Sequence, residues 1–247
     1  MSLPKLSVSE QLAAAFSRTP PTLPAAVSAM CDAVLMDVAG LCVAARHSDY
    51  VQAALRATAE PGACTLIGHA GGFNVATAAL CNGTAAHGED YDDTFEGGPV
   101  HAGAVIIPAV LAAAEQHGLS GGDVARGVAV GCEVMCRLCL VAPKRVHKAG
   151  FHPTAVFGAL GAAAGVAMAL RLTDTQWFNA LGIAGSMASG IIEYLAEGAW
   201  TKRMHPGWAA QAGYRLQMLL PSKWHNPLHY SSVSCAMESE YLHMHQM

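Results

Sequence analysis

The chain has 247 residues, of which 53% are hydrophobic and only 13% are charged. Its length suits one large domain or two small ones, and its composition allows a large core and does not resemble that of a disordered protein. The formal net charge of −4 gives no basic face, so we expect no nucleic-acid partner. An anionic substrate is still allowed, because a pocket can be locally positive.

Helical periodicity runs through almost the whole sequence, and strand-like alternation is nearly absent. Two capping boxes, Ser7-x-x-Glu10 and Thr173-x-x-Gln176, mark helix starts. The predicted fold class is therefore all-α, with one short extended piece over residues 63–67. Helices are expected over residues 7–16, 25–46, 49–59, 74–87, 101–117, 123–141, 154–172, 173–196 and 209–220.

Residues 154–172 are long and apolar enough to be considered as a membrane span. They consist largely of Ala, Gly and Val, no aromatic belts flank them, and no second segment pairs with them. We therefore expect a buried central helix and no membrane partner. Small residues from Gly158 to Gly165 recur on one helix face, which in a water-soluble protein predicts close helix packing.

Eight cysteines lie mostly within apolar, helix-like runs. They indicate small buried hydrophobic side chains in a reducing compartment, so we expect a cytoplasmic protein without a disulfide framework. The pair Cys136 and Cys139 forms a CxxC, but no second CxxC and no histidine pair at zinc spacing accompanies it. We expect no metal or redox role for it.

The character of the sequence changes after Pro221, where His, Ser, Tyr and Met become frequent and helical periodicity fades. We therefore predict a helical domain over residues 1–220. Residues 221–247 form an atypical tail, with two alternatives left open: a disordered segment, or the end of a prematurely terminated reading frame.

Three polar segments interrupt the apolar sequence, and each lies at an expected helix junction: residues 87–101, 150–154 and 200–207. Each has a plain structural interpretation, because Asp and Thr cap helices and Lys-Arg after a helix complements the helix dipole. Together they supply carboxylates, imidazoles and a Lys-Arg pair, which can bind a small polycarboxylate and move its protons. No GxGxxG, P-loop or zinc signature occurs, so neither a nucleotide cofactor nor a metal is expected.

These segments also resemble the signature of a known family. The run Cys81-Asn82-Gly83-Thr84-Ala85-Ala86-His87-Gly88-Glu89-Asp90-Tyr91-Asp92-Asp93-Thr94, followed by Gly98-Pro99-Val100-His101, is similar to the MmgE/PrpD motif. Gly150-Phe151-His152-Pro153-Thr154 and Lys202-Arg203-Met204-His205-Pro206-Gly207-Trp208-Ala209-Ala210 resemble two further motifs in the same order. The likeness covers about residues 11–220.

The resemblance implies a large helical-bundle domain of the MmgE/PrpD type in a cofactor-independent enzyme, usually a homodimer, that acts on a small carboxylic acid. The family includes 2-methylcitrate dehydratase, cis-aconitate decarboxylase and iminodisuccinate epimerase. It implies that the catalytic candidates are Asp90, which contacts or helps to position the substrate, and His101 and His152, which supply imidazoles for proton transfer or substrate binding. It also implies that Lys202 binds a substrate carboxylate. The further substrate-binding candidates are Thr94, Arg203 and His205.

Family members are close to twice this length, and a lid domain supplies further catalytic residues. Nothing after Leu220 resembles that lid, so we expect the sequence to hold one wall of the pocket. Two hypotheses follow. The chain is a lyase that dehydrates or decarboxylates a citrate- or aconitate-like acid, with epimerisation as a related reaction. Alternatively, it is a catalytically inactive truncated or split domain that serves in dimerisation or partner binding.

Overall fold

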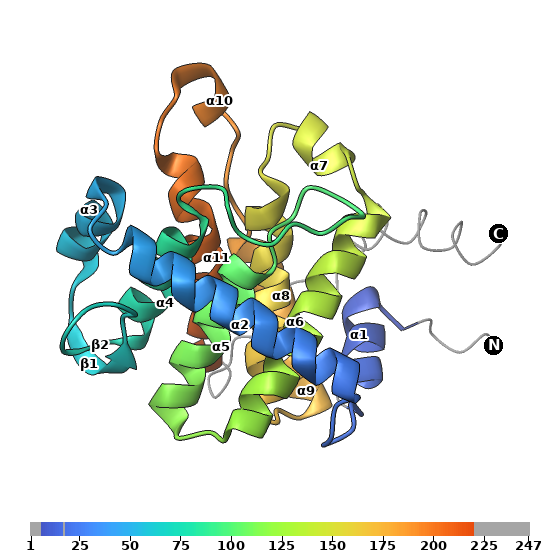
Figure 1. Ribbon diagram of the computed structural model, residues 1–247. Coiled ribbons are helices and arrows are strands. Elements are labelled where there is room, and N and C mark those ends of the chain that lie inside the picture. Colours follow the sequence, from blue (N-terminus) through green and yellow to red (C-terminus); the bar gives the residue numbers. More distant parts are fainter. Residues whose placement is uncertain (1–5, 17, 220–247) are drawn as a thin grey trace, which may run out of the picture.

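The computed structural model describes residues 6–16 and 18–219, and side chains up to residue 215 (Figure 1). Helices dominate these residues, which confirms the all-α prediction. The predicted boundary at residue 220 and the tail 221–247 lie outside the described residues. The helices are α1 (Val8–Phe16), α2 (Ala25–Ala45), α3 (Asp49–Thr58), α4 (Val75–His87), α5 (Gly103–His117), α6 (Gly121–Val141), α7 (Arg145–Lys148), α8 (Pro153–Ala169), α9 (Asp174–Met187), α10 (Tyr194–Glu197) and α11 (Thr201–Leu219).

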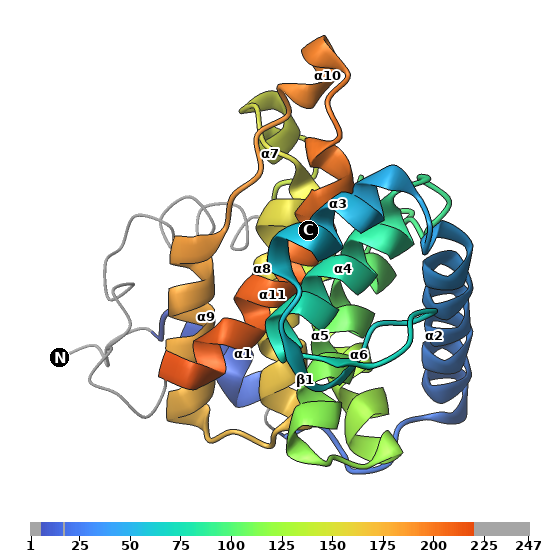
Figure 2. The same ribbon diagram turned by 90° about the vertical axis from the view of Figure 1, so that its left-hand side faces the viewer.

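The short extended segment expected over residues 63–67 is part of a small antiparallel sheet. It forms strand β1 (Pro61–Thr65), which pairs with strand β2 (Gly72–Phe73). Both strands lie at the edge of the bundle beside α4 and α5 (Figures 1 and 2). The sheet closes the turn that leads into α4 and contributes no functional side chain to the site described below.

Helix α8 lies at the centre of the bundle, in contact with α5, α6, α9 and α11 (Figure 2). Nearly all of its side chains are buried, which confirms the prediction of a central helix over residues 154–172. A Cβ atom added to Gly165 would lie 2.8 Å from the Gly127 carbonyl oxygen, and one on Gly161 would lie 3.0 Å from that of Gly131. The small-residue face of α8 therefore packs backbone to backbone against α6, as predicted.

A second close crossing joins α4 to α11. A Cβ atom on Gly207 would overlap the Leu80 carbonyl oxygen, and one on Gly83 would lie 2.6 Å from the Gly207 Cα atom. Only glycine at these positions lets the two backbones approach so closely. This contact places the first turns of α11 against the last turn of α4, and it thereby positions two of the three polar segments.

The prediction of one continuous helix over residues 173–196 is wrong. Helix α9 ends at Met187, and an extended stretch leads to the short α10. Gly190 has φ +107°, a left-handed conformation that no helix interior allows, and its carbonyl accepts the His152 backbone N–H at 2.8 Å. Phe151 and Ile191 form an isolated antiparallel bridge. This tertiary pairing with the segment before α8 outweighs the local helical pattern.

The start of the last helix was also predicted wrongly. Helix α11 begins at Thr201, not at residue 209, so the third polar segment is helical and does not form a loop. The sequence pattern predicted a helix junction over residues 200–207. Pro206 removes one backbone hydrogen bond, but it lies within a helix whose burial against α4 and α8 supplies the stabilisation.

Within the described part of the chain, α2 is the one helix long and apolar enough, by length and composition, to cross a membrane. Only 17% of its most apolar 18-residue window is buried. Length and composition do not separate such a helix from a core helix or a signal sequence. The expectation of no membrane partner stays a prediction.

The seven cysteines within the described residues are all free. Cys136 and Cys139 lie on α6, and burial raises the pKa of both thiols, that of Cys136 to about 11. Both thiols are therefore protonated at neutral pH, which weakens them as nucleophiles and as metal ligands.

Candidate active site

The three polar segments meet where α4 ends and α5, α8 and α11 begin. His87 is the last residue of α4, His101 lies just before α5, and His152 is the N-cap residue of α8. Lys202 lies in the first turn of α11. Because three helix N-termini converge here, their dipoles favour a negatively charged ligand. Residues from distant parts of the sequence thus share one site.

Four imidazole rings form a cluster in the site, in which three rings are buried and that of His101 is partly buried. The His87 ring centroid lies 4.8 Å from that of His101 and 5.7 Å from that of His152. The His152 and His205 centroids are 5.3 Å apart, and their Nδ1 atoms are 3.2 Å apart. His87 therefore links the other rings into one cluster.

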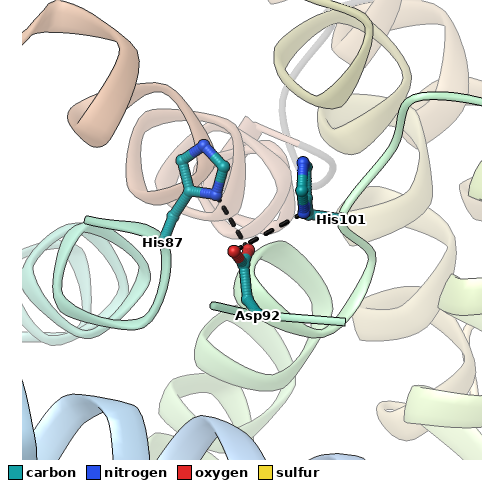
Figure 3. A group of neighbouring side chains, drawn as sticks. All are labelled: His87, Asp92 and His101. Carbon is teal, nitrogen blue, oxygen red and sulfur yellow. Dashed lines mark hydrogen bonds and ion pairs between the residues drawn. The ribbon is translucent and has the colours of Figure 1, made fainter. Parts of the chain in front are cut away.

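Asp92 lies between two of these rings (Figure 3). Its Oδ2 atom is 2.8 Å from His87 Nδ1, and its Oδ1 atom is 3.5 Å from His101 Nδ1. His101 Nδ1 also lies 3.1 Å from the Asp93 carbonyl oxygen, which can only accept a hydrogen bond. His101 therefore carries a proton on Nδ1 and leaves its Nε2 atom as the free acceptor.

His87, Asp92 and His101 offer ligand atoms that all lie within 4.8 Å of one another, so we tested them as a metal site. The His101 Nδ1 atom is a hydrogen-bond donor to a carbonyl oxygen, and a metal ligand must present a lone pair. The geometry therefore fits a hydrogen-bonded group better than a metal centre.

Burial keeps three of the imidazoles uncharged at neutral pH. Desolvation lowers the pKa of His152 to about 2 and that of His205 to about 4, and the neighbouring His87 acts in the same direction. The pKa of His101 is also lowered, chiefly by desolvation, although the Asp92 charge opposes this. An uncharged imidazole has a lone pair that can accept a hydrogen bond or a proton, but pKa values this low make His152 and His205 weak bases.

Two cationic side chains border the cluster on the solvent side. Lys202 Nζ donates a hydrogen bond to Asp90 Oδ1. Arg203 stacks over the Tyr50 ring, with its Cζ atom 4.5 Å from the ring centroid. Its Nη1 atom lies 3.6 Å from Glu89 Oε1. These cations are therefore held in place before any substrate carboxylate binds.

Asp90 adopts an uncommon backbone conformation at the edge of the site. Its φ of 54° lies in the left-handed region, which Asp tolerates better than most residues. Partial burial opposes its ionisation, but the hydrogen bond and charge of Lys202 outweigh this and lower the pKa of the Asp90 carboxyl. Asp90 is thus an ionised partner for Lys202 at neutral pH.

A cavity of about 270 Å³ opens beside these residues. Its wall contains Asp90, Lys202 and Arg203 together with His87 and Tyr194. A volume of this size suits a small organic acid. The two cations and the imidazole can act on the same ligand.

The structure brings the predicted site residues together. Asp90, Lys202 and Arg203 line the cavity, while His101, His152 and His205 form the imidazole cluster. Thr94 is exposed, with its hydroxyl 3.4 Å from His101 Nδ1. This proximity agrees with the predicted site, and the roles assigned to these residues stay predictions.

Sequence reasoning missed His87 and Asp92 as individual site residues, although both belong to the first polar segment. The signal that could have identified His87 is its place as the last residue of a helix. Asp93, by contrast, acts as the helix-capping interpretation suggested, because its Oδ1 atom accepts the Gly103 backbone N–H at 2.8 Å. Burial raises the pKa of Asp93 to about 6.

Comparison with known proteins matches residues 10–221 to the MmgE/PrpD N-terminal domain. The chain belongs to the MmgE/PrpD family. This match covers the segment in which the sequence motifs occur, and it confirms the family that they indicated.

Three curated relatives show how far the similarity extends. The chain is 33% identical to "Cis-aconitate decarboxylase" of Aspergillus terreus over 170 residues, or 66% of this chain and 34% of that protein. It is 36% identical to the Homo sapiens "Cis-aconitate decarboxylase" over 152 residues, or 58% and 30%. It is 29% identical to "Cis-aconitate decarboxylase-like protein oryM" of Aspergillus oryzae over 205 residues, or 78% and 42%. The matches thus span less than half of each relative.

Proposed function

We propose that this MmgE/PrpD chain is a cofactor-independent lyase that acts on a small di- or tricarboxylate. The observation that carries the proposal is the cavity that Lys202 and Arg203 line together with His87, one ring of the imidazole cluster. The names of the curated relatives favour decarboxylation of an aconitate-like acid, and dehydration of a citrate-like acid uses the same chemistry. Because the matches cover less than half of each relative, the activity of this chain has to be established by experiment.

In this proposal the cations bind substrate carboxylates and the imidazoles move a proton at the carbon next to one of them. Lys202 is already paired with Asp90, so an arriving carboxylate joins or replaces that partner. The uncharged ring of His101 is the candidate base, and the ring of His152, whose low pKa makes it a weak base, is the candidate for substrate binding. Fixed positive charge stabilises the enolate-like intermediate as negative charge develops.

Two further expectations belong to the proposal, one from the family resemblance and one from the eight cysteines that indicate a reducing compartment. We expect the protein to form a homodimer, and we expect it in the cytoplasm. Light scattering of the purified chain tests the first expectation, and a monomer at micromolar concentration would contradict it. Cell fractionation tests the second.

The decisive test is incubation of the purified chain with cis-aconitate or 2-methylcitrate, followed by NMR of the products. Product that forms with the wild-type chain but not with the Lys202→Met variant would support the proposal. No turnover and no binding of either acid would overturn it. That result would favour the alternative of a non-catalytic helical domain that serves in dimerisation or partner binding.

A further inference from the structure

One buried imidazole in the cavity wall has no role in the family-derived set of site residues. His87 is 1% exposed, and its Nδ1 atom lies 2.8 Å from Asp92 Oδ2. Its Nε2 atom is buried and has no hydrogen-bond partner among the described residues. A buried polar atom without a partner is unfavourable, so its presence here requires an explanation.

The position of His87 suggests that explanation. His87 lines the cavity with Lys202 and Arg203, whereas His101 and His152 are not among its lining residues. Since Nδ1 faces the Asp92 carboxylate, the ring is oriented with Nε2 on the opposite side, away from Asp92 (Figure 3). Within the cluster, His87 is therefore the imidazole placed to meet a ligand in the cavity.

A carboxylate oxygen already occupies the space between His87 and the cation. Asp90 Oδ1 accepts the hydrogen bond of Lys202 Nζ and lies 3.7 Å from His87 Nε2. This separation is longer than a hydrogen bond, so Nε2 keeps its bonding capacity, and because the atom is buried a ligand reaches it by displacing the Asp90 carboxylate. A substrate carboxylate bound to Lys202 would lie beside the same ring nitrogen and would bring the adjacent carbon within its reach.

We propose that His87 is a further catalytic residue of this site, with Nε2 as the proton-transfer atom, and that Asp92 is its positioning residue. This inference rests on the proposed function. The Asp92 carboxylate accepts the Nδ1 proton, which fixes the orientation and tautomer of the ring. The Nε2 atom, which has no hydrogen-bond partner among the described residues, then forms its hydrogen bond with the substrate.

In a decarboxylation, His87 Nε2 donates a proton to the substrate carbon that loses CO₂. The C–C bond to the departing carboxylate breaks, CO₂ leaves, and the electron pair stays on the substrate as a carbanion delocalised into its unsaturated system. A proton carried by His87 Nε2 forms the new C–H bond, and solvent returns a proton to Nε2. In a dehydration the same atom accepts the proton from carbon, the C–O bond breaks, and the hydroxyl group leaves as water with a proton from solvent.

A purely structural role makes different predictions. If Asp92 only ties the end of α4 to the segment before α5 through two imidazoles, then a side chain that keeps the hydrogen bond would preserve all properties. The His87→Asn substitution tests this, because the asparagine Nδ2 atom can replace Nδ1 as the donor to Asp92 while no atom replaces Nε2. Asp92→Asn removes the carboxylate acceptor with little change of shape.

The experiment uses the full chain, the variants His87→Asn and Asp92→Asn, and His117→Gln as a matched control at the far end of α5. Turnover of cis-aconitate is measured by NMR, and binding of cis-aconitate is measured by calorimetry. Imidazole ¹⁵N spectra with and without the acid report directly on His87, whether or not turnover occurs.

We expect His87→Asn to bind the acid within about threefold of wild type and to lose 10²- to 10⁴-fold in kcat, the usual range for a removed acid-base group. Asp92→Asn should change the ¹⁵N tautomer pattern of His87 and lower kcat with little change in KM, while His117→Gln should resemble wild type. Binding that leaves the His87 resonances unmoved, or a His87→Asn variant with the kcat of His117→Gln, would overturn the inference alone. Absence of both binding and turnover in the wild-type chain would overturn the proposed function with it.

Discussion

The crossing of α6 with α8 and the meeting point of α4, α5, α8 and α11 are both buried, but their side chains differ. At the crossing, Gly127, Gly131, Gly161 and Gly165 bring two backbones into contact without any ionisable group. At the meeting point, His87, His152 and Asp92 are equally buried, and two of their polar atoms lack a hydrogen-bond partner among the residues that the structure describes.

Within this bundle, the crossing therefore contributes to stability and the meeting point contributes to function. Close packing of small residues gains dispersion energy and leaves no polar group unsatisfied. Burying imidazoles and a carboxylate with unpartnered atoms is unfavourable unless a ligand completes the hydrogen bonds. Variants at the crossing should therefore change unfolding, and variants at the meeting point should mainly change ligand binding or chemistry.

The largest expected effect is on stability at the crossing. The Cβ atom of Gly165→Ala would lie 2.8 Å from the Gly127 carbonyl oxygen and 3.1 Å from a Val110 methyl carbon, so the helices must separate. We expect the free energy of unfolding to fall by about 3 kcal/mol, as for overpacked cores, in urea titrations. Gly40→Ala on α2 is the matched control, since nothing lies within 4 Å, and it should add about 0.5–1 kcal/mol. Equal effects of the two changes would contradict the comparison.

The next effect concerns ligand binding. Lys202→Met removes the cation that pairs with Asp90 and, in our proposal, with substrate. We expect the Kd for cis-aconitate to rise about 10- to 100-fold in calorimetry, from the loss of one charge-assisted hydrogen bond. Stability should change little, because this ion pair is partly exposed. The exposed Lys144→Met is the control, and an equal loss of affinity there would remove Lys202 from the site.

A smaller effect should follow acidification. His152 and His205 have folded pKa values of about 2 and about 4, so between about pH 6.5 and pH 4 the unfolded chain binds protons that the folded chain does not. Stability therefore falls with pH in this window, while Asp93, whose folded pKa of about 6 is raised, offsets one of the two protons. The lowered pKa of His101 adds to this loss, so we expect stability to fall by at least about 1.4 kcal/mol per pH unit.

Urea titrations at pH 7 and pH 5 measure this dependence. His205→Gln removes one of the two buried imidazoles, so its stability should depend less on pH than that of the wild type or of the His117→Gln control. A His205→Gln variant with an unchanged pH dependence would show that this ring does not titrate as the structure indicates.

The smallest effect is expected at the start of α6. The Ser120 hydroxyl accepts the Asp123 backbone N–H at 3.2 Å as part of a capping box. Ser120→Ala should lower the free energy of unfolding by about 1 kcal/mol and leave cis-aconitate affinity unchanged. The Ser120 cap lies next to the C-terminal end of α5, whereas the site lies at the N-terminal end of that helix. A change in cis-aconitate affinity would therefore mean that the two regions are coupled.

Much of the helical pattern could be predicted from the sequence, because it depends on local signals. The capping boxes at Ser7 and Thr173 begin helices as expected, and the small residues of α8 pack as predicted. The two errors, at the end of α9 and the start of α11, arose where contacts between distant segments outweigh local preference. Gly190 pairs with the segment before α8, and Gly207 is buried against Leu80.

The sequence by itself determined the fold class, the family and the three polar segments that carry the site, because residue type, periodicity and motif order are properties of the linear chain. Only the tertiary structure decided that His87 links the imidazoles, that Asp92 lies between two of them, and that Lys202 pairs with Asp90. These contacts depend on how closely α4 and α11 approach each other. That approach is fixed by glycines 124 positions apart, Gly83 and Gly207 (207 minus 83), whose pairing no local pattern reveals.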